Sequence, residues 1–218
     1  AMLSPGAALR WFKDQFCSEE EEMARKLSLS PYRIMDLESE NSSPASNGLI
    51  FLPYMQGERS PVWNPHARGV FFGLSLETTK ADMIRSMLEG TAYGLRQNLG
   101  IGEGSLGVAV KEIRIVGGGA KSKTWSQIKA DILKRPMILL DQQETAVLGA
   151  AMLGGLASGR FKEHKEAAWK TSAHPSREFL PNPDLGRLYD QMYESYLILY
   201  RRMEDLFEKV FQVRSQPC

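Results

Sequence analysis

The stretch RIVGGGAKSKTW, from Arg114 to Trp125, decides how this chain is interpreted. A short run rich in apolar residues, Glu112 to Val116, ends at three consecutive glycines, and a sequence typical of a helix follows. Glycine adopts unusual backbone angles and, without a Cβ, lets a ligand approach the main chain. The free N–H groups of the next helix favour an anion. The stretch predicts a strand, a phosphate-binding loop and a helix, with a ligand-free turn as the alternative.

Two other glycine motifs give no support for a nucleotide. A P-loop needs Gly-Lys followed by Ser or Thr, and GGGAKS has no Gly-Lys pair. The dinucleotide pattern G-x-G-x-x-G does occur, at Gly102, Gly104 and Gly107. It follows a predicted helix and opens none, so it lacks the required context. We expect a solvent-exposed connection of small residues there.

Composition limits the function classes. The 218 residues, 43% hydrophobic and 24% charged, suffice for one large domain or two small ones. A net charge of +1 gives no electrostatic case for nucleic acid or an anionic membrane. No 18-residue apolar stretch exists, so we expect no membrane span. Cys17 and Cys218 match no metal or redox spacing, which favours a reducing, cytoplasmic compartment.

The pattern of apolar residues predicts mixed α/β structure. The polar stretch 18–47 predicts an acidic, solvated helix face and then a loop. Strand, helix, strand, helix between residues 112 and 159 predicts parallel pairing of the two strands. The other expected elements are a helix over 4–16 with Ser4 as its cap, strands over 48–55 and 69–76, and a helix over 79–99 with Thr79 and Asp82 as a capping box.

A long helix is expected from about residue 184 to 213. One row of its residues sits at spacings of three or four and could be a coiled-coil seam: Leu188, Met192, Ser195, Leu199, Met203, Leu206 and Val210. We favour a helix packed across the sheet, because four tyrosines, at 189, 193, 196 and 200, broaden the apolar face.

Three blocks of sequence carry a resemblance to a known family. They are GERSPVWNPHARGVFFGL, VGGGAKSKTWSQIKADILKRP and ETAVLGAAMLGGLASG. From Met2 to about Lys170 the chain resembles the C-terminal domain of the FGGY family of carbohydrate kinases, with blocks most similar to those of xylulokinases. The resemblance implies an α/β, actin-like ATPase fold of the ribonuclease H type, with a mixed sheet flanked by helices. We expect residues 1–218 to form one nucleotide-binding domain that includes the long helix 184–214.

The resemblance also implies a function. FGGY kinases bind ATP in the cleft between two domains, and the sugar and the catalytic aspartate belong mostly to the N-terminal domain. Nothing here resembles the start of that domain, so we expect a C-terminal fragment that is inactive alone. The intact protein would transfer the γ-phosphate of Mg²⁺-ATP to a sugar hydroxyl, of a ketopentose such as xylulose. Its partners would be ATP or ADP and the sugar, with a homodimer possible.

Site residues follow position by position from the resemblance. Gly118, Gly119 and Ala120 match the loop that contacts the nucleotide phosphates and adenosine. Lys123 takes a position near the adenine that is asparagine in some relatives. Gly6 matches a glycine near the phosphates, and Arg10, at a position that can be glutamine, could contact phosphate or ribose. No residue here is expected to be the catalytic base or a metal ligand.

Other polar residues have simpler explanations. Glu58 and Arg59, in GERSP, could line the cleft or only fix the loop, and Arg68 is similar. Asp131 lies in a predicted helix, where a structural hydrogen bond or solvent contact is expected. The three histidines show no triad or metal spacing. The competing function is a non-catalytic actin-like module that associates through its C-terminal helix.

Overall fold

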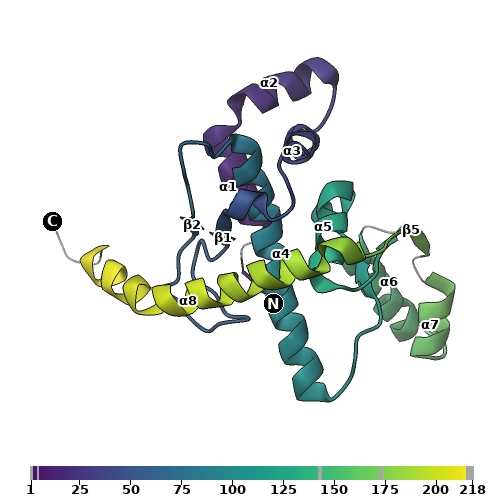
Figure 1. Ribbon diagram of the computed structural model, residues 1–218. Coiled ribbons are helices and arrows are strands. Elements are labelled where there is room, and N and C mark those ends of the chain that lie inside the picture. The colour runs from purple at the N-terminus through teal and green to yellow at the C-terminus, as the bar shows by residue number, and fades with distance from the viewer. Residues whose placement is uncertain (1, 4, 142–143, 172–173, 215–218) are drawn as a thin grey trace.

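The computed structural model describes residues 2–3, 5–141, 144–171 and 174–214 (Figure 1). Its helices are α1 (Pro5–Phe16), α2 (Ser18–Leu27), α3 (Pro31–Ser39), α4 (Lys80–Leu106), α5 (Lys123–Leu133), α6 (Thr145–Ala157), α7 (His164–Thr171) and α8 (Gly186–Arg214). Short 3₁₀ turns are η1 (Ser46–Gly48), η2 (Gly118–Lys121) and η3 (Pro183–Leu185). The strands are β1 (Ile50–Leu52), β2 (Val70–Phe72), β3 (Ile113–Ile115), β4 (Met137–Leu140) and β5 (Pro175–Phe179).

The long helix α4 organises the fold. Figure 1 shows it running through the middle of the molecule, with α1, α2 and α3 around its upper half and α8 crossing it. Its start is the expected capping box, in which Thr79 and Asp82 satisfy each other's backbone N–H groups. Within the described residues, no helix combines the length and the apolar character that a membrane crossing demands.

The prediction for the second glycine pattern was wrong. Gly102 and Gly104 lie inside α4, and Gly107 ends the helix in the left-handed conformation with φ +63°. Helix α4 therefore continues seven residues past the predicted end at residue 99. Glycine lowers helix stability without forbidding the helix, and the backbone continues through it. The Glu103 carboxylate supports this end by accepting hydrogen bonds from the Val110 N–H and from Arg135.

Two small sheets are present among the described residues. β1 pairs antiparallel with β2, while β3 pairs parallel with β4, as the strand–helix–strand order predicted. β5 adds an antiparallel edge to β4. Its sequence, PSREF, is mostly polar and exposed, so it lacks the apolar alternation that marks a strand.

The polar stretch 18–47 contains more structure than expected. The acidic helix is present as α2, but one of its glutamates, Glu20, is only 6% exposed and contacts Lys80 at 2.7 Å. A further helix, α3, lies between the acidic helix and the loop. Proline at the first position and a Met-Ile pair facing inward are the local signals for α3.

The core joins α1, β1, α4, α5 and α8. The long helix α8 occupies the predicted range and packs through its tyrosines, since Tyr189, Tyr196 and Tyr200 are all buried. The hydroxyls of Tyr54 and Tyr196 hydrogen bond at 2.7 Å inside this core. The coiled-coil row is divided, because Leu199 is buried while Leu206 is 45% exposed. This pattern favours a packed helix over a coiled-coil seam, and α8 packs on α4, α5 and β1.

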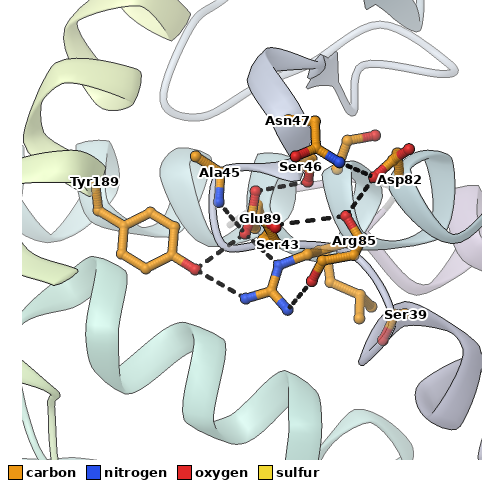
Figure 2. Close-up of polar contacts among 12 residues, drawn as sticks. Ser39, Ser43, Ala45, Ser46, Asn47, Asp82, Arg85, Glu89 and Tyr189 are labelled. Carbon is orange, nitrogen blue, oxygen red and sulfur yellow. Dashed lines mark hydrogen bonds and ion pairs between the residues drawn. The ribbon is translucent and has the colours of Figure 1, made fainter. Parts of the chain in front are cut away.

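Charged residues of α4 also lie inside the protein, and Figure 2 shows how they pair. Glu89 Oε1 accepts hydrogen bonds from Arg85 Nε at 2.8 Å, from the Ala45 N–H at 3.0 Å and from the Tyr189 hydroxyl at 2.9 Å. Ser46 donates to the other carboxylate oxygen at 2.7 Å. Burial raises the pKa of Glu89, and the charge of Arg85 opposes that rise. Glu89 thus connects α4, α8 and the turn before β1.

The backbone of that turn is left-handed. Residues Ala45, Ser46, Asn47 and Gly48 have φ values of +69°, +49°, +51° and +87°. The left-handed region costs a non-glycine residue about 1–2 kcal/mol. Besides Glu89, the Asp82 carboxylate holds the turn, by accepting hydrogen bonds from Asn47 Nδ2 at 2.8 Å and from Ser42 Oγ at 2.6 Å. Two buried carboxylates on one face of α4 therefore offset the strain.

Candidate functional site

The glycine loop connects a strand to a helix, as the sequence predicted. β3 ends at Ile115, and Gly117 then turns the chain with φ +82°, in the left-handed region that favours glycine. The turn η2 is closed by a hydrogen bond from the Ala120 N–H to the Gly117 carbonyl at 3.1 Å. Ser122 caps the next helix, α5, by accepting a hydrogen bond from the Trp125 N–H at 2.9 Å.

The residues of the loop differ in how much space surrounds them. A Cβ placed on Gly118 would meet no atom within 4 Å, and the residue is exposed. A Cβ on Gly119 would lie 3.0 Å from the ring of Trp125, so glycine is needed there for packing. Ala120 is only 3% exposed, and its N–H is already bonded to the Gly117 carbonyl. Gly118 is therefore the open position among the three predicted site residues, and a Cβ on Gly117 would also meet no atom within 4 Å.

Trp125 supports the loop from the side of the core. Its indole Nε1 donates to the Leu88 carbonyl at 3.1 Å and to Thr91 Oγ1 at 3.2 Å, both on α4. The ammonium of Lys129 lies 3.9 Å from the centre of the indole ring. The sequence predicted the helix that carries Trp125, but the approach of Gly119 to its ring was not visible in the spacing of apolar residues.

Lys123 is the first residue of α5, and its side chain is exposed. It borders a cavity of about 330 Å³ between α5, β5 and the end of α3. The lining carries both signs of charge, with Glu40 and Asp131 as acids and Arg177 as a further base. The cavity is lined by Glu40, Arg85, Lys123, Thr124, Gln127, Ile128, Asp131, Arg177 and Phe179. The glycine loop contributes no lining residue, so of the predicted site residues only Lys123 reaches this cavity.

Gly6 and Arg10 lie on α1, and both are exposed. Both α1 and α5 pack against α4. Arg10 makes no hydrogen bond or ion pair with any residue that the structure describes. The structure thus places Gly118–Ala120 and Lys123 together at the start of α5, with Gly6 and Arg10 on a separate helix. Ser4, the predicted cap of α1, lies outside the described residues.

The GERSP loop is held by its own glutamate. Glu58 is 2% exposed, and its Oε1 accepts hydrogen bonds from the backbone N–H groups of Leu3 at 2.9 Å and Arg59 at 2.8 Å. Arg68 donates to the carbonyls of Pro65 and Ala67. Of the two alternatives for these residues, the contacts support the fixing of loop geometry.

The contacts of Asp131 and His66 indicate structural roles. Asp131 accepts hydrogen bonds from Gln127 Nε2 and from the Asn182 N–H, each at 2.8 Å, as expected for a residue inside a helix. His66 contacts Glu208 and stacks on Phe211, at 3.9 Å between ring centres. Within the described ranges, no three histidine, cysteine or carboxylate side chains gather as they would around a metal ion.

Comparison with known proteins defines the class. Residues 2–158 match the family model described as the C-terminal domain of the FGGY family of carbohydrate kinases. This match covers well over half of the chain, so the protein contains a carbohydrate kinase domain, and the chain belongs to the FGGY family.

Individual relatives carry several names. The gluconokinase of Bacillus subtilis is 33% identical over 208 residues, which are 94% of this chain and 40% of the relative. A xylulose kinase of Staphylococcus epidermidis is 34% identical over 204 residues, with 94% of this chain and 39% of the relative covered. The chain thus spans about 40% of the length of the curated relatives that it matches.

Solved structures confirm the fold. The xylulose kinase from Rhodospirillum rubrum superposes with a TM-score of 0.79 at 27% identity, covering 95% of this chain and 40% of that one. The glycerol kinase of Plasmodium falciparum, solved with ADP, is 20% identical with a TM-score of 0.71 over 90% of this chain and 37% of that one, and shows the fold alone. The structural neighbours have the actin-like ATPase fold, and the expected α/β class with a mixed sheet is confirmed.

Proposed function

We propose that residues 1–218 form a single nucleotide-binding domain, which makes one wall of the ATP site in a carbohydrate kinase. The observation that carries the proposal is the open glycine loop between β3 and α5. A Cβ at Gly118 would meet no atom within 4 Å, so the position has room for a ligand. The first N–H groups of α5 and η2 follow directly, where an anion is favoured.

Each part of ATP has an expected partner in the proposal. The backbone of Gly118, Gly119 and Ala120 would contact the phosphates and adenosine, with Lys123 at the edge of the base. Gly6 and Arg10 would approach the nucleotide from α1. Mg²⁺, which neutralises charge on the transferred phosphoryl group, would come with the nucleotide. The described residues offer no cluster of ligands that would hold this ion by themselves.

The sugar and the catalytic base lie outside this chain in the proposal. Phosphoryl transfer needs an oriented hydroxyl and a carboxylate that accepts its proton. The buried carboxylates Asp82, Glu89 and Asp131 are all engaged in hydrogen bonds that hold the fold. The chain alone is therefore expected to bind nucleotide without phosphorylating a sugar.

The proposed substrate is a ketopentose such as xylulose, in the cytoplasm. Relatives named xylulose kinase, both curated and solved, support it. Gluconate is the second candidate, because relatives named gluconokinase are equally similar, at 33% and 35% identity. A panel of xylulose, other pentuloses and gluconate, tested on a kinase that joins this chain to its N-terminal domain, separates the two. Activity on gluconate but not on xylulose would replace the first candidate by the second.

Nucleotide binding is tested by calorimetry of the chain with ADP. The variant Gly118→Leu should abolish binding, because its side chain would occupy the open space of the loop. Gly104→Leu is the matched control, since a Cβ at Gly104 also meets no atom within 4 Å but lies on α4. Equal binding by both variants, or sugar phosphorylation by the chain alone, would contradict the proposal.

The second candidate function is association through α8. The outer face of this helix exposes Leu206, Val210 and Val213, at 45%, 54% and 68%. An apolar groove of about 170 Å³ lies beside them, lined in part by His66 and Phe211. Sedimentation of the wild type and of Leu206→Asp tests for a homodimer. Leu199 is unsuitable for this test, because it is 7% exposed and belongs to the core.

A further inference from the structure

A buried carboxylate on α3 contacts Ser122, the residue between the glycine loop and helix α5. Asp36 is 6% exposed, and its Oδ1 accepts a hydrogen bond from Ser122 Oγ at 2.8 Å. These residues are 86 positions apart in the sequence. Neither the loop motif nor the resemblance pointed to α3.

Ser122 concentrates several contacts at one residue. Its hydroxyl accepts the Trp125 N–H at 2.9 Å and donates to Asp36. Its carbonyl accepts from the Ser126 hydroxyl at 2.7 Å and from the Ser126 N–H at 3.1 Å. A serine hydroxyl has one proton, so donating it to Asp36 directs the lone pairs of the oxygen toward the helix. The carboxylate therefore sets the orientation of the helix cap.

Burial raises the pKa of Asp36, while the hydrogen bond from Ser122 and the charge of Arg33 favour its ionised form. A negative group near the first turn of a helix interacts favourably with its N–H groups, and a hydrogen bond to an ionised acceptor is stronger than a neutral one. On the other side of the loop, Trp125 is hydrogen bonded to α4 and lies under Gly119. The loop is thus anchored to α3 by Asp36 and to α4 by Trp125.

We propose that Asp36 is a positioning residue for nucleotide binding: through Ser122 it fixes the start of α5, and with it the backbone of residues 117–121. The inference rests on the proposed function of the loop. It adds α3, an element outside the nucleotide motif, to the machinery that shapes the site.

The test compares two buried aspartates of the same chemistry. Asp36→Asn keeps an acceptor for the Ser122 hydroxyl but removes its charge, and it should weaken ADP binding by about five- to tenfold, the difference between a charge-assisted and a neutral hydrogen bond. Asp82→Asn is the matched control, because Asp82 also accepts a hydrogen bond from a serine hydroxyl near a helix start, but on α4. The control should lower stability and leave ADP affinity within about twofold. Equal loss of affinity in both variants would overturn the positioning role.

A double-mutant cycle with Ser122→Ala identifies the route. If Asp36 acts through Ser122, Asp36→Asn should weaken binding in the wild type and add little in the Ser122→Ala background. An equal effect in both backgrounds would overturn the inference. If the wild type binds ADP and Asp36→Asn binds it with the same affinity, the positioning role is overturned and the proposed function stands. No ADP binding by the wild type would overturn the proposed function, and the positioning role with it.

Amide exchange in the free protein covers the case in which Asp36→Asn folds poorly. Ser122→Ala removes the hydrogen bond to Asp36 by changing its donor, which is partly exposed, and it leaves the residues of α3 unchanged. It should speed exchange at residues 118–121 more than at α3. Unchanged exchange at the loop in this variant would also overturn the proposal.

Discussion

Helices α4 and α6 contrast in what they bury. The first half of α4 buries charged residues, among them Asp82, Arg85 and Glu89, and each of them has hydrogen-bond partners. In α6 every residue after Thr145 is alanine, valine, leucine, methionine or glycine, yet none of its 13 residues is buried. A helix that is apolar on all sides is usually an interior one. Composition therefore decides burial less than the contacts that the rest of the chain supplies.

The largest effect on stability is expected for Glu89→Gln in α4. Replacing a buried carboxylate leaves Arg85 without its counter-charge, and breaking such a pair costs about 3–5 kcal/mol. The free energy of unfolding in urea should fall by that amount. Glu77→Gln, a change of the same chemistry at an exposed residue just before α4, should alter it by no more than about 0.5 kcal/mol. A loss below about 1 kcal/mol in Glu89→Gln would show that the α4 cluster is not a stabilising core.

The next effect is expected at Gly90 of α4. A Cβ there would lie 2.1 Å from the backbone oxygen of Phe51, so the helix must move away from β1. Overpacking of this kind costs about 1–3 kcal/mol, despite the better helix propensity of alanine. Thermal unfolding of Gly90→Ala should show a lower midpoint than the wild type. A raised midpoint would mean that α4 and β1 pack less tightly than described.

The same substitution in α6 should have the opposite sign. A Cβ at Gly154 would meet no atom within 4 Å, and the residue lies inside a helix. Gly154→Ala should therefore gain about 0.5–1 kcal/mol from helix propensity alone. Both variants are measured by thermal unfolding. If Gly90→Ala and Gly154→Ala shift the midpoint in the same direction, the contrast between α4 and α6 is contradicted.

The last effect is a dependence on pH at Glu38 of α3, a residue whose pKa is influenced by Lys80 at the start of α4. Burial, and then the neighbouring carboxyl of Glu20, raise the pKa of Glu38 to about 7. The folded state then holds a proton that the unfolded state releases near its ordinary pKa of 4.5. Stability from this group is complete below pH 4.5 and is lost as the pH rises to 7.

Glu38→Gln should therefore flatten the decline of the unfolding midpoint between pH 4.5 and 7. An unchanged slope would remove Glu38 from the explanation. Helix α6 contains no titratable side chain between Thr145 and Ala157, and substitutions within it should leave the slope as it is.

Local patterns predicted a large part of the fold. Capping residues, apolar spacing and glycine placement sufficed for α4, α5, α8 and the strand–loop–helix around Gly117, because each depends on neighbours in sequence. β5 and α3 were missed, since a polar edge strand and a short helix take their stability from packing rather than pattern. The end of α4 was misplaced because glycine only weakens a helix.

The site was predictable only in its motif. The positions Gly118 to Ala120 followed from sequence, but which of them is open was decided by Trp125 and the core beneath it. Asp36 could not be found, because a contact across 86 residues leaves no local signal. The roles of all these positions toward a nucleotide, and those of Gly6, Arg10 and Lys123, stay predictions.

The turn at residues 45–48 has a consequence for chirality. Its φ values are those for which D-amino acids, the mirror images of the natural ones, are suited. D-alanine at position 45 should therefore fit the turn better than the natural L-residue. A peptide of residues 42–50 alone should not adopt the turn, because the carboxylates that hold it, Asp82 and Glu89, belong to a helix that begins 30 residues later. The handedness of this segment is thus imposed by the rest of the domain.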